Sequence, residues 1–235
     1  MIRAFLFDMD GLLIDSERIY TEVTNEVLHT YGKGSLPWSI KAKLQGLPGT
    51  EASRVLLEWA QLPISPEKYY EEQILRLQKH WNETKFMPGA LELLRRATDA
   101  GIPIALATSS ATTAYQLKTN HLRDGFDLFG THVVTGDDPR IPPGRGKPAP
   151  DIWLVALQSL NDGREDPILP EECIVFEDGI PGVRAGRSAG ASIVWVPDPR
   201  ILAEFHGKKQ EIVGAKGQIL ASLEEFQGKQ HGLSM

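Results

Sequence analysis

The sequence predicts an α/β protein in which a doubly wound, parallel, Rossmann-like sheet carries an inserted all-α domain. Three observations predict this fold. Short, continuous apolar runs stop abruptly at polar residues, as is typical of strands buried on both faces of a parallel sheet. Helical patterns separate most of these runs, so strands and helices alternate along the chain. One long interval near the N-terminus breaks the alternation, because it contains helical patterns alone.

Five apolar runs predict the strands of the sheet, and a shorter sixth run predicts an edge strand. In chain order they are residues 2–7, 104–107, 132–135, 173–176, 192–196 and 218–220. Apolar residues at 90, 91, 94 and 97 share one face of a predicted helix that ends at Gly101. Residues 182–189 predict a short helix ended by Gly190, and residues 223–226 predict another. Residues 229–235 are expected to be frayed.

The interval 16–86 contains helical patterns and no convincing strand. Apolar residues at 19, 20, 23 and 27 predict a helix that begins with Ser16 as its N-cap. A second stripe lies at 55–59, and Ser65 followed by a proline opens a third helix. We therefore expect an all-α domain over residues 16–86, inserted into an α/β core domain formed by residues 1–15 and 87–235. The chain crosses twice between the two domains, and these crossings could act as a hinge.

The composition excludes several classes of protein. With 41% hydrophobic and 24% charged residues, the 235-residue chain is neither disordered nor too small to bury its own core. Its net charge of −6 provides no overall basic surface for nucleic acid, and no apolar run approaches the ~18 residues of a membrane span. The single cysteine, Cys173, cannot form an internal disulfide, which suits a reducing compartment. We therefore expect a cytoplasmic monomer that binds neither nucleic acid nor membranes.

Polar residues follow the predicted strands, at the point where each strand ends. They are Asp8 and Asp10, Thr108, Ser109 and Ser110, Asp137 and Asp138, and Glu177 and Asp178, with Lys147 in the loop beyond the third strand. Because ligands bind beyond the carboxyl ends of the strands in an open parallel sheet, these side chains are expected to share one site. Acids at one edge repel one another unless a cation joins them, and carboxylates with few histidines favour Mg²⁺. The pattern therefore predicts a site for phosphate and magnesium.

Each member of this set also has a structural interpretation. The hydroxyls at 108–110 could cap the following helix, Lys147 could be a solvated surface lysine, and Glu177 with Asp178 could form a turn. The apolar residues at 12–14 argue against a calcium-binding loop beginning at Asp8, because ligands would be needed at these positions. The order of the set favours the site, because successive strands each end in such a group.

Four motifs at these strand ends resemble the signatures of the haloacid dehalogenase (HAD) superfamily of phosphotransferases. They are FDMDG at 7–11, ATS at 107–109, GKPAPD at 146–151 and ED at 177–178. The resemblance covers nearly the whole chain, and the helical insertion stands where this superfamily places its cap, directly after the first strand. At a finer level the sequence is similar to the pseudouridine-5′-phosphatases and related small-metabolite phosphatases. The resemblance implies a HAD-like core domain with an α-helical cap domain.

The resemblance also implies how the matched residues would act on a phosphate ester. Asp8 would attack phosphorus and form an aspartyl phosphate. Asp10 would protonate the leaving oxygen and then activate the water that hydrolyses this intermediate. Thr108 and the Ser109 amide would bind phosphoryl oxygens, and Lys147 would neutralise both Asp8 and the developing charge. In this family the peptide bond after the lysine is often cis, and we expect a cis bond at 147–148.

The same resemblance implies Mg²⁺ as the cofactor. Asp8, the carbonyl of Asp10 and Asp178 would hold the ion, and Glu177 would support these ligands. The ion would let two anions, the Asp8 carboxylate and the phosphate, approach each other. The presence of Asp10 argues against the dehalogenase branch of the superfamily, which lacks this acid-base aspartate.

Substrate specificity in this family resides in the cap and in the loop that joins it to the core. The candidate substrate-binding residues, besides Thr108, Ser109 and Lys147, are Gly11, Glu17, Tyr20, Gly46 and Gly49. Related phosphomutases carry an arginine in the turn 45–50 to hold a second phosphate, whereas this turn has Pro48 followed by Gly49. The absence of that charge favours a substrate with one phosphate.

We therefore predict a Mg²⁺-dependent phosphatase of a small phosphorylated metabolite. The metabolite would be a nucleoside 5′-phosphate such as pseudouridine 5′-phosphate, or a sugar or polyol phosphate. A β-phosphoglucomutase-like phosphomutase that uses the same aspartyl phosphate is the alternative. A third hypothesis is a non-catalytic module that binds a phosphorylated ligand, and the intact set of Asp8, Asp10, Lys147 and Asp178 argues against it.

Overall fold

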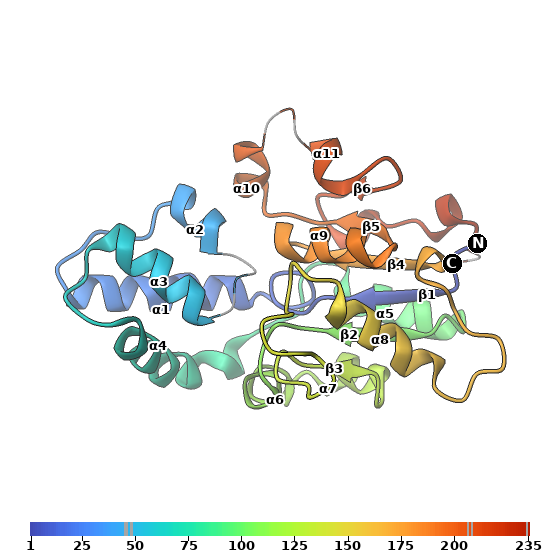
Figure 1. Ribbon diagram of the computed structural model, residues 1–235, viewed down its shortest axis with the longest axis horizontal. Helices are drawn as coiled ribbons and strands as arrows, with labels where there is room; N and C mark the ends of the chain where they lie inside the picture. The colour runs from blue at the N-terminus through green and yellow to red at the C-terminus, as the bar shows by residue number, and fades with distance from the viewer. Residues whose placement is uncertain (45–46, 48, 206, 208, 234) are drawn as a thin grey trace.

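The fold is built on a six-stranded parallel sheet, seen in a computed structural model that describes residues 1–44, 47, 49–205, 207, 209–233 and 235. The strands run in the order β3-β2-β1-β4-β5-β6 (Figure 1). Their bounds are β1 (Ala4–Phe7), β2 (Ile104–Ala107), β3 (Val133–Val134), β4 (Cys173–Glu177), β5 (Ser192–Trp195) and β6 (Gln218–Ile219). Each neighbouring pair is parallel, and the order runs outward in both directions from the centre. The predicted doubly wound α/β fold is confirmed, edge strand included.

The central strands are continuous apolar runs because both of their faces are covered. Every residue of β1, β2 and β4 is buried. Alternate side chains of β1 enter two different clusters, with Phe5 and Phe7 on one face and Ala4 and Leu6 on the other. The Phe7 ring stacks on Phe176 of β4 with 4.6 Å between the ring centroids. Burial of each such aromatic side chain stabilises the fold by about 1.5–3 kcal/mol.

Helices pack on both faces of the sheet. The face of Phe5 and Phe7 is covered by α5 (Ala90–Asp99), α6 (Thr112–Thr119), α7 (Arg123–Phe126) and the 3₁₀ turns η2 (Asp127–Phe129) and η4 (Leu223–Glu225). The other face is covered by α8 (Asp151–Asn161), α9 (Ile180–Ala189) and α11 (Lys209–Val213). The chain also forms α10 (Pro199–Glu204), η3 (Pro170–Glu172) and η5 (Gly228–His231). As predicted, Gly190 ends α9, where its φ of 95° suits glycine.

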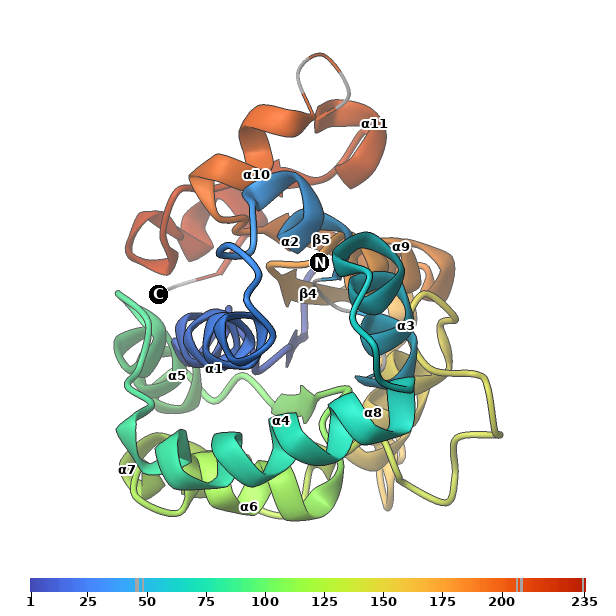
Figure 2. The same ribbon diagram turned by 90° about the vertical axis from the view of Figure 1, so that its left-hand side faces the viewer.

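Between β1 and α5 the chain forms a group of helices that stands apart from the sheet. They are α1 (Ser16–Thr30), α2 (Trp38–Leu44), α3 (Gly49–Ala60) and α4 (Pro66–His80), followed by the 3₁₀ turn η1 (Trp81–Glu83). Figure 1 shows them beyond the carboxyl end of β1, and Figure 2 shows them from their own side. They bury an apolar cluster of their own around Leu28, Leu56 and Tyr69. The division into two domains at residues 15/16 and 86/87 stays a prediction.

The two segments that join these helices to the sheet are hydrogen-bonded to each other. Ile14 pairs with Phe86 in an antiparallel bridge. The Asp15 amide donates to the Lys85 carbonyl at 3.0 Å, and the Lys85 amide donates to Asp15 Oδ1 at 2.7 Å. The chain therefore leaves the sheet and returns to it at one place.

Some local predictions are correct and others are wrong. Ser65 caps α4, since its hydroxyl accepts a backbone hydrogen bond at 3.2 Å. Ser16 is the first residue of α1 and not its N-cap. Asp15 occupies the cap position, but its carboxylate accepts from the Lys85 amide and does not cap the helix. The described residues of the C-terminal segment are not frayed, because η5 forms and Met235 packs against the main core cluster. Among the described residues no helix is long and apolar enough to cross a membrane.

Candidate active site

Three buried carboxylates meet where β1 and β4 end. One oxygen from each of Asp8, Glu177 and Asp178 lies within 4.8 Å of the others. The register of the sheet brings them together, because Phe7 pairs with Phe176 and the Asp8 amide donates to the Phe176 carbonyl at 3.0 Å. The strand order reverses between β1 and β4, and open α/β sheets bind their ligands at such a point.

Lys147 extends its ammonium into this carboxylate cluster. Nζ donates to Asp8 Oδ1 at 2.5 Å, to Glu177 Oε1 at 2.7 Å and to the Ala107 carbonyl at 3.1 Å. The side chain is 2% exposed. Burial on its own would lower the pKa of Lys147, but the charges of Asp8 and Glu177 outweigh it and raise that pKa. The bond from Lys147 to Pro148 is cis, as expected.

The surroundings of Asp8 disfavour its negative charge. Burial is the largest influence and raises the pKa of Asp8 well above its usual value. The charge of Lys147 opposes this rise, whereas the charges of Glu177 and Asp10 add to it. A divalent cation among the three carboxylates would offset this repulsion and favour the ionised nucleophile. Because the ligand set is made of oxygens, it fits the predicted Mg²⁺.

Asp10 lies two residues after Asp8 and faces the helical insertion. Its Oδ1 accepts hydrogen bonds from the Ser16 hydroxyl and from Lys118 Nζ, both at 2.6 Å. Its Oδ2 accepts from the Ser110 hydroxyl at 2.8 Å and from the Thr108 hydroxyl at 3.3 Å. Burial alone would raise the pKa of Asp10, but the charge and hydrogen bond of Lys118 outweigh burial and lower that pKa. Four donors therefore surround the two oxygens of Asp10 and favour its carboxylate form before a phosphate ester binds.

Lys118 contacts Asp10 directly, although the sequence analysis did not identify it as a site residue. It lies on α6, and its side chain is fully buried. Besides Asp10, its ammonium donates to the Ser110 hydroxyl at 2.9 Å and to the Tyr20 hydroxyl at 3.0 Å. The ammonium also lies 4.5 Å from the centre of the Trp81 ring, at the end of the insertion.

Two predicted binding residues shape the loops around the carboxylates. Gly11 packs against Asp178, and a Cβ at this position would collide with that carboxylate. Its φ of 84° also requires glycine. The Thr108 hydroxyl accepts the Ser110 amide at 3.0 Å and contacts Asp10, so it stabilises the loop after β2.

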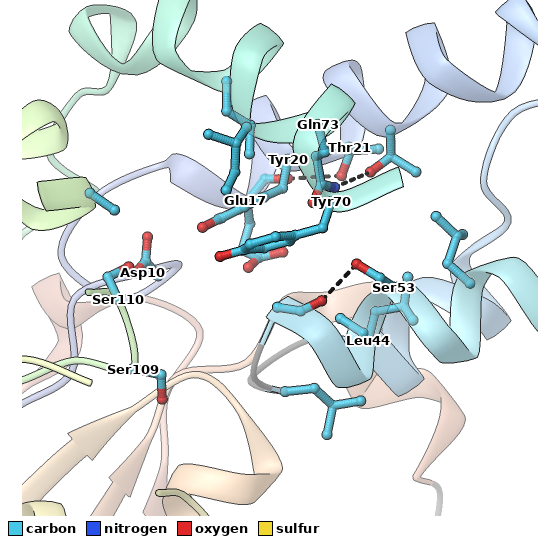
Figure 3. A pocket seen from close by; sticks show the side chains of 18 of the residues that line it. Asp10, Glu17, Tyr20, Thr21, Leu44, Ser53, Tyr70, Gln73, Ser109 and Ser110 are labelled. Atoms are coloured by element: carbon cyan, nitrogen blue, oxygen red, sulfur yellow. Dashed lines mark hydrogen bonds between the residues drawn. The ribbon is translucent and has the colours of Figure 1, made fainter. Parts of the chain in front are cut away.

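A cavity of about 300 Å³ extends from Asp10 into the helical insertion (Figure 3). The predicted residues Glu17, Tyr20, Ser109 and Gly49 line this cavity, whereas Gly46 lies outside the described residues. Lining residues that the sequence analysis did not single out include Thr24, Lys41, Ser53, Tyr69, Tyr70 and Gln73. The cavity therefore combines aromatic rings with hydroxyl and amide groups beside the predicted acid-base residue.

Two charged side chains that line the cavity, Glu17 and Lys41, are paired with each other. Lys41 Nζ donates to the Glu17 carbonyl at 2.8 Å and to the Thr21 hydroxyl, and it lies 3.5 Å from the Glu17 carboxylate. Burial raises the pKa of Glu17, and Lys41 opposes this rise. Among the described residues that line the cavity, Lys41 is the one cation, and Glu17 already engages it.

Two acids from the predicted set lie outside the site. Asp137 accepts hydrogen bonds from the Thr112 amide and hydroxyl, both at 2.9 Å, at the start of α6. Asp138 forms an ion pair with Arg140 at 2.7 Å. Their grouping with the other acids is wrong because β3 is the edge strand, two positions away from β1. The two carboxylates are instead bound by groups beside this edge strand.

Comparison with known proteins agrees with this geometry. The haloacid dehalogenase-like hydrolase family model matches residues 2–190. A probable pseudouridine-5′-phosphatase of Saccharomyces cerevisiae is 50% identical over 232 residues, which cover 99% of this chain and 98% of the relative. The (DL)-glycerol-3-phosphatase 2 of Arabidopsis thaliana is 39% identical over 230 residues, covering 97% of this chain and 90% of the relative.

A solved structure with the same fold comes from Deinococcus radiodurans. This HAD family hydrolase, with bound phosphate and sodium, superposes with a TM-score of 0.74 at 28% identity and covers 99% of this chain and 98% of its own. The expected enzyme class, a HAD-type phosphatase, is thus confirmed together with the fold. The length and identity of these matches show that the chain belongs to the haloacid dehalogenase-like hydrolase family.

Proposed function

We propose that this chain is a Mg²⁺-dependent hydrolase of phosphate monoesters in which Asp8 carries the phosphoryl group between two steps. The observation that supports it most directly is the position of Lys147, whose ammonium bridges Asp8 and Glu177 beside Asp178. A cation fixed on the nucleophilic carboxylate can also neutralise the charge of a phosphoryl group in transfer. This arrangement serves phosphoryl transfer better than the binding of a phosphorylated ligand alone.

The two steps use the paired aspartates after β1. In the first step, an Asp8 oxygen attacks phosphorus while the bond from phosphorus to the leaving oxygen breaks. The leaving oxygen takes a proton from Asp10, and the alcohol departs. In the second step, water attacks phosphorus, Asp10 takes its proton, and the bond to Asp8 breaks to release inorganic phosphate. Thr108 and the Ser109 amide would hold the phosphoryl oxygens.

The carboxylates at the ends of β1 and β4 would hold Mg²⁺. The proposed ligands are Asp8, Asp178 and the Asp10 carbonyl. Glu177 would support this ligand set, and its own carboxylate is held by a hydrogen bond from Lys147. When bound, the ion would offset the negative charges of carboxylate and phosphate so that the two can approach each other.

Metal removal is expected to abolish turnover. EDTA should stop phosphate release, and added Mg²⁺ should restore it. Asp178→Asn should raise the Mg²⁺ concentration for half-maximal activity by at least roughly 10–100-fold, because loss of a group that merely orients a ligand already costs this much and here a ligand itself loses its charge. The measurement is phosphate release titrated with Mg²⁺. The matched control is Asp138→Asn, whose carboxylate pairs with Arg140 away from the site. Activity that persists in EDTA would exclude the metal.

The cavity beside Asp10 favours a substrate with one phosphate and an uncharged leaving group. A second phosphate would meet no unengaged cation among the described lining residues, because Glu17 already pairs with Lys41. This favours hydrolysis over the phosphomutase alternative. The rings of Tyr20 and Tyr70 suit a flat, polar base, so pseudouridine 5′-phosphate or a similar nucleoside 5′-phosphate is the preferred substrate class over a polyol phosphate. Every residue in this proposal comes from one chain, so a monomer would be sufficient for the activity.

The test is phosphate release from a panel of esters. The panel contains pseudouridine 5′-phosphate, nucleoside monophosphates, glycerol 3-phosphate and hexose phosphates, each with Mg²⁺ and with EDTA. We expect Mg²⁺-dependent release that is fastest with a nucleoside 5′-phosphate. The same samples are analysed by phosphorus NMR, where isomerised sugar phosphate without free phosphate would establish the mutase instead. Binding of esters without either product would establish the binding module.

A further inference from the structure

A fully buried lysine, Lys118, lies where the helical insertion meets the sheet, and the two steps above assign it no role. Its ammonium carries three protons, and it has three oxygen acceptors: Asp10 Oδ1 at 2.6 Å, the Ser110 hydroxyl at 2.9 Å and the Tyr20 hydroxyl at 3.0 Å. Figure 3 shows these three acceptors close together at one end of the cavity. Every proton of the ammonium is therefore directed at the predicted acid-base residue or at its neighbours.

Packing alone does not explain a charge at this position. The side chain fills the space beside the rings of Tyr20 and Trp81, whose centres lie 4.8 and 4.5 Å from Nζ. A methionine of similar length would fill the same space without the cost of removing an ammonium from water. The two rings also face this charge, but among the described residues Asp10 is the carboxylate that forms an ion pair with it, at 2.6 Å.

The two oxygens of Asp10 differ in their partners. Oδ1 accepts from Lys118 and from the Ser16 hydroxyl, whereas Oδ2 accepts from the hydroxyls of Ser110 and Thr108. An ammonium can only donate, so a proton on Oδ1 would have to turn the Ser16 hydroxyl away and would lie beside the positive charge of Lys118. A hydroxyl can donate or accept, so the partners of Oδ2 can turn and accept when Oδ2 carries a proton.

We propose that Lys118 is a positioning residue that reserves Oδ2 of Asp10 for the proton transfers of the reaction. This inference rests on the proposed phosphatase function. In the first step the O–H bond at Oδ2 breaks, its electron pair stays on the carboxylate, and the proton goes to the leaving oxygen. In the second step Oδ2 takes a proton from the attacking water, which restores the acid. Lys118 keeps its own protons throughout and acts only through Asp10.

The test compares two substrates that differ in their need for a proton. An alkyl phosphate requires protonation of its leaving oxygen, whereas p-nitrophenyl phosphate releases a stable phenolate without it. The quantity compared is kcat/KM, because it reports the first step alone. We expect Lys118→Met to lower kcat/KM by about 100-fold for the alkyl phosphate and by less than about threefold for p-nitrophenyl phosphate. A merely structural role would lower both values by the same factor, and that result would overturn the proposal.

Two controls separate this role from general damage. Lys41→Met removes the other buried lysine near the cavity, which bonds to Glu17 and Thr21, and it should change kcat/KM for both substrates equally. In an Asp10→Asn background, Lys118→Met should have almost no further effect, because residues that act as a unit are not additive. A full additional loss in that background would contradict action through Asp10.

A second variant covers the case in which Lys118→Met does not fold. Lys118→Gln keeps a hydrogen-bond donor and loses the charge, and it should show the same dependence on the leaving group. If the wild-type protein hydrolyses neither substrate, the proposed function fails. If it hydrolyses both and the Gln variant loses both equally, only the role of Lys118 fails.

Discussion

Asp8→Asn is expected to lower phosphate release to below about 0.1% of wild type, a loss of at least ~4 kcal/mol in transition-state stabilisation. The amide has nearly the shape of the carboxylate but cannot act as the nucleophile, so no aspartyl phosphate forms. Burial raises the pKa of Asp8 in the folded protein, so folding disfavours the ionised carboxylate. As the pH rises above the usual carboxyl range, Asp8 therefore lowers the stability of the wild-type fold. The variant should therefore melt at the wild-type temperature or higher in EDTA at neutral pH.

The measurement combines phosphate release with thermal unfolding of the same sample. Asp138→Asn is the matched control, since it makes the same chemical change in an acid that pairs with Arg140 outside the site, and it should keep wild-type activity. An Asp8→Asn protein that melts normally and keeps more than about 1% of the activity, a loss of only ~2.7 kcal/mol, would show that another group is the nucleophile.

Lys147→Met is expected to lower both activity and stability. Turnover should fall by about 1000-fold, because the cation that faces the developing phosphoryl charge is gone. The raised pKa of Lys147 means that its charged form stabilises the fold, and this contribution is fully present at neutral pH, below the usual pKa of lysine. Its loss leaves Asp8 and Glu177 buried without their ammonium partner, which should destabilise the protein by about 3–5 kcal/mol.

The response of the melting temperature to Mg²⁺ distinguishes destabilisation by the unpaired carboxylates from destabilisation by lost packing. A divalent cation can replace part of the missing charge, so Mg²⁺ should raise the melting temperature of Lys147→Met more than that of the wild type. Lys41→Met breaks a partly buried ion pair with Glu17, outside the group of three carboxylates, and its melting temperature should respond to Mg²⁺ as the wild type does. Equal responses in all three proteins would exclude an ion among these carboxylates.

The sequence could predict the carboxylate cluster because local features determine it. Asp8 directly follows a short apolar run, and Glu177 and Asp178 follow another, which marks them as ends of buried strands. Parallel strands end at one edge of a sheet, so such residues come close wherever their strands are neighbours. The sequence did not show which strands are neighbours, and for that reason Asp137 and Asp138 were grouped with the site as well.

Lys118 could not be found in this way, because its burial depends on segments distant in the chain. On α6 the apolar Leu117 is 42% exposed while its charged neighbour Lys118 is fully buried, which is the reverse of an amphipathic pattern. The cover comes from Tyr20 and Trp81 of the helical insertion. Ser16 was interpreted as a helix cap because its residue type and place before an apolar stripe do not reveal that its hydroxyl binds Asp10, six residues earlier.

The hydrogen-bonded pair of segments at Asp15 and Lys85 has a consequence for how this protein can diverge. Since the inserted helices begin and end at one place, their length and side chains can change without displacing the strands that carry the carboxylates. We therefore expect mutations in the insertion to alter substrate selection while the reacting groups stay in register. Exchange of the insertion between homologues should change the substrate and keep the chemistry, provided that Ser16, Tyr20 and Trp81, which contact Asp10 or Lys118, are retained. Substrate choice and catalysis could then evolve separately in one gene.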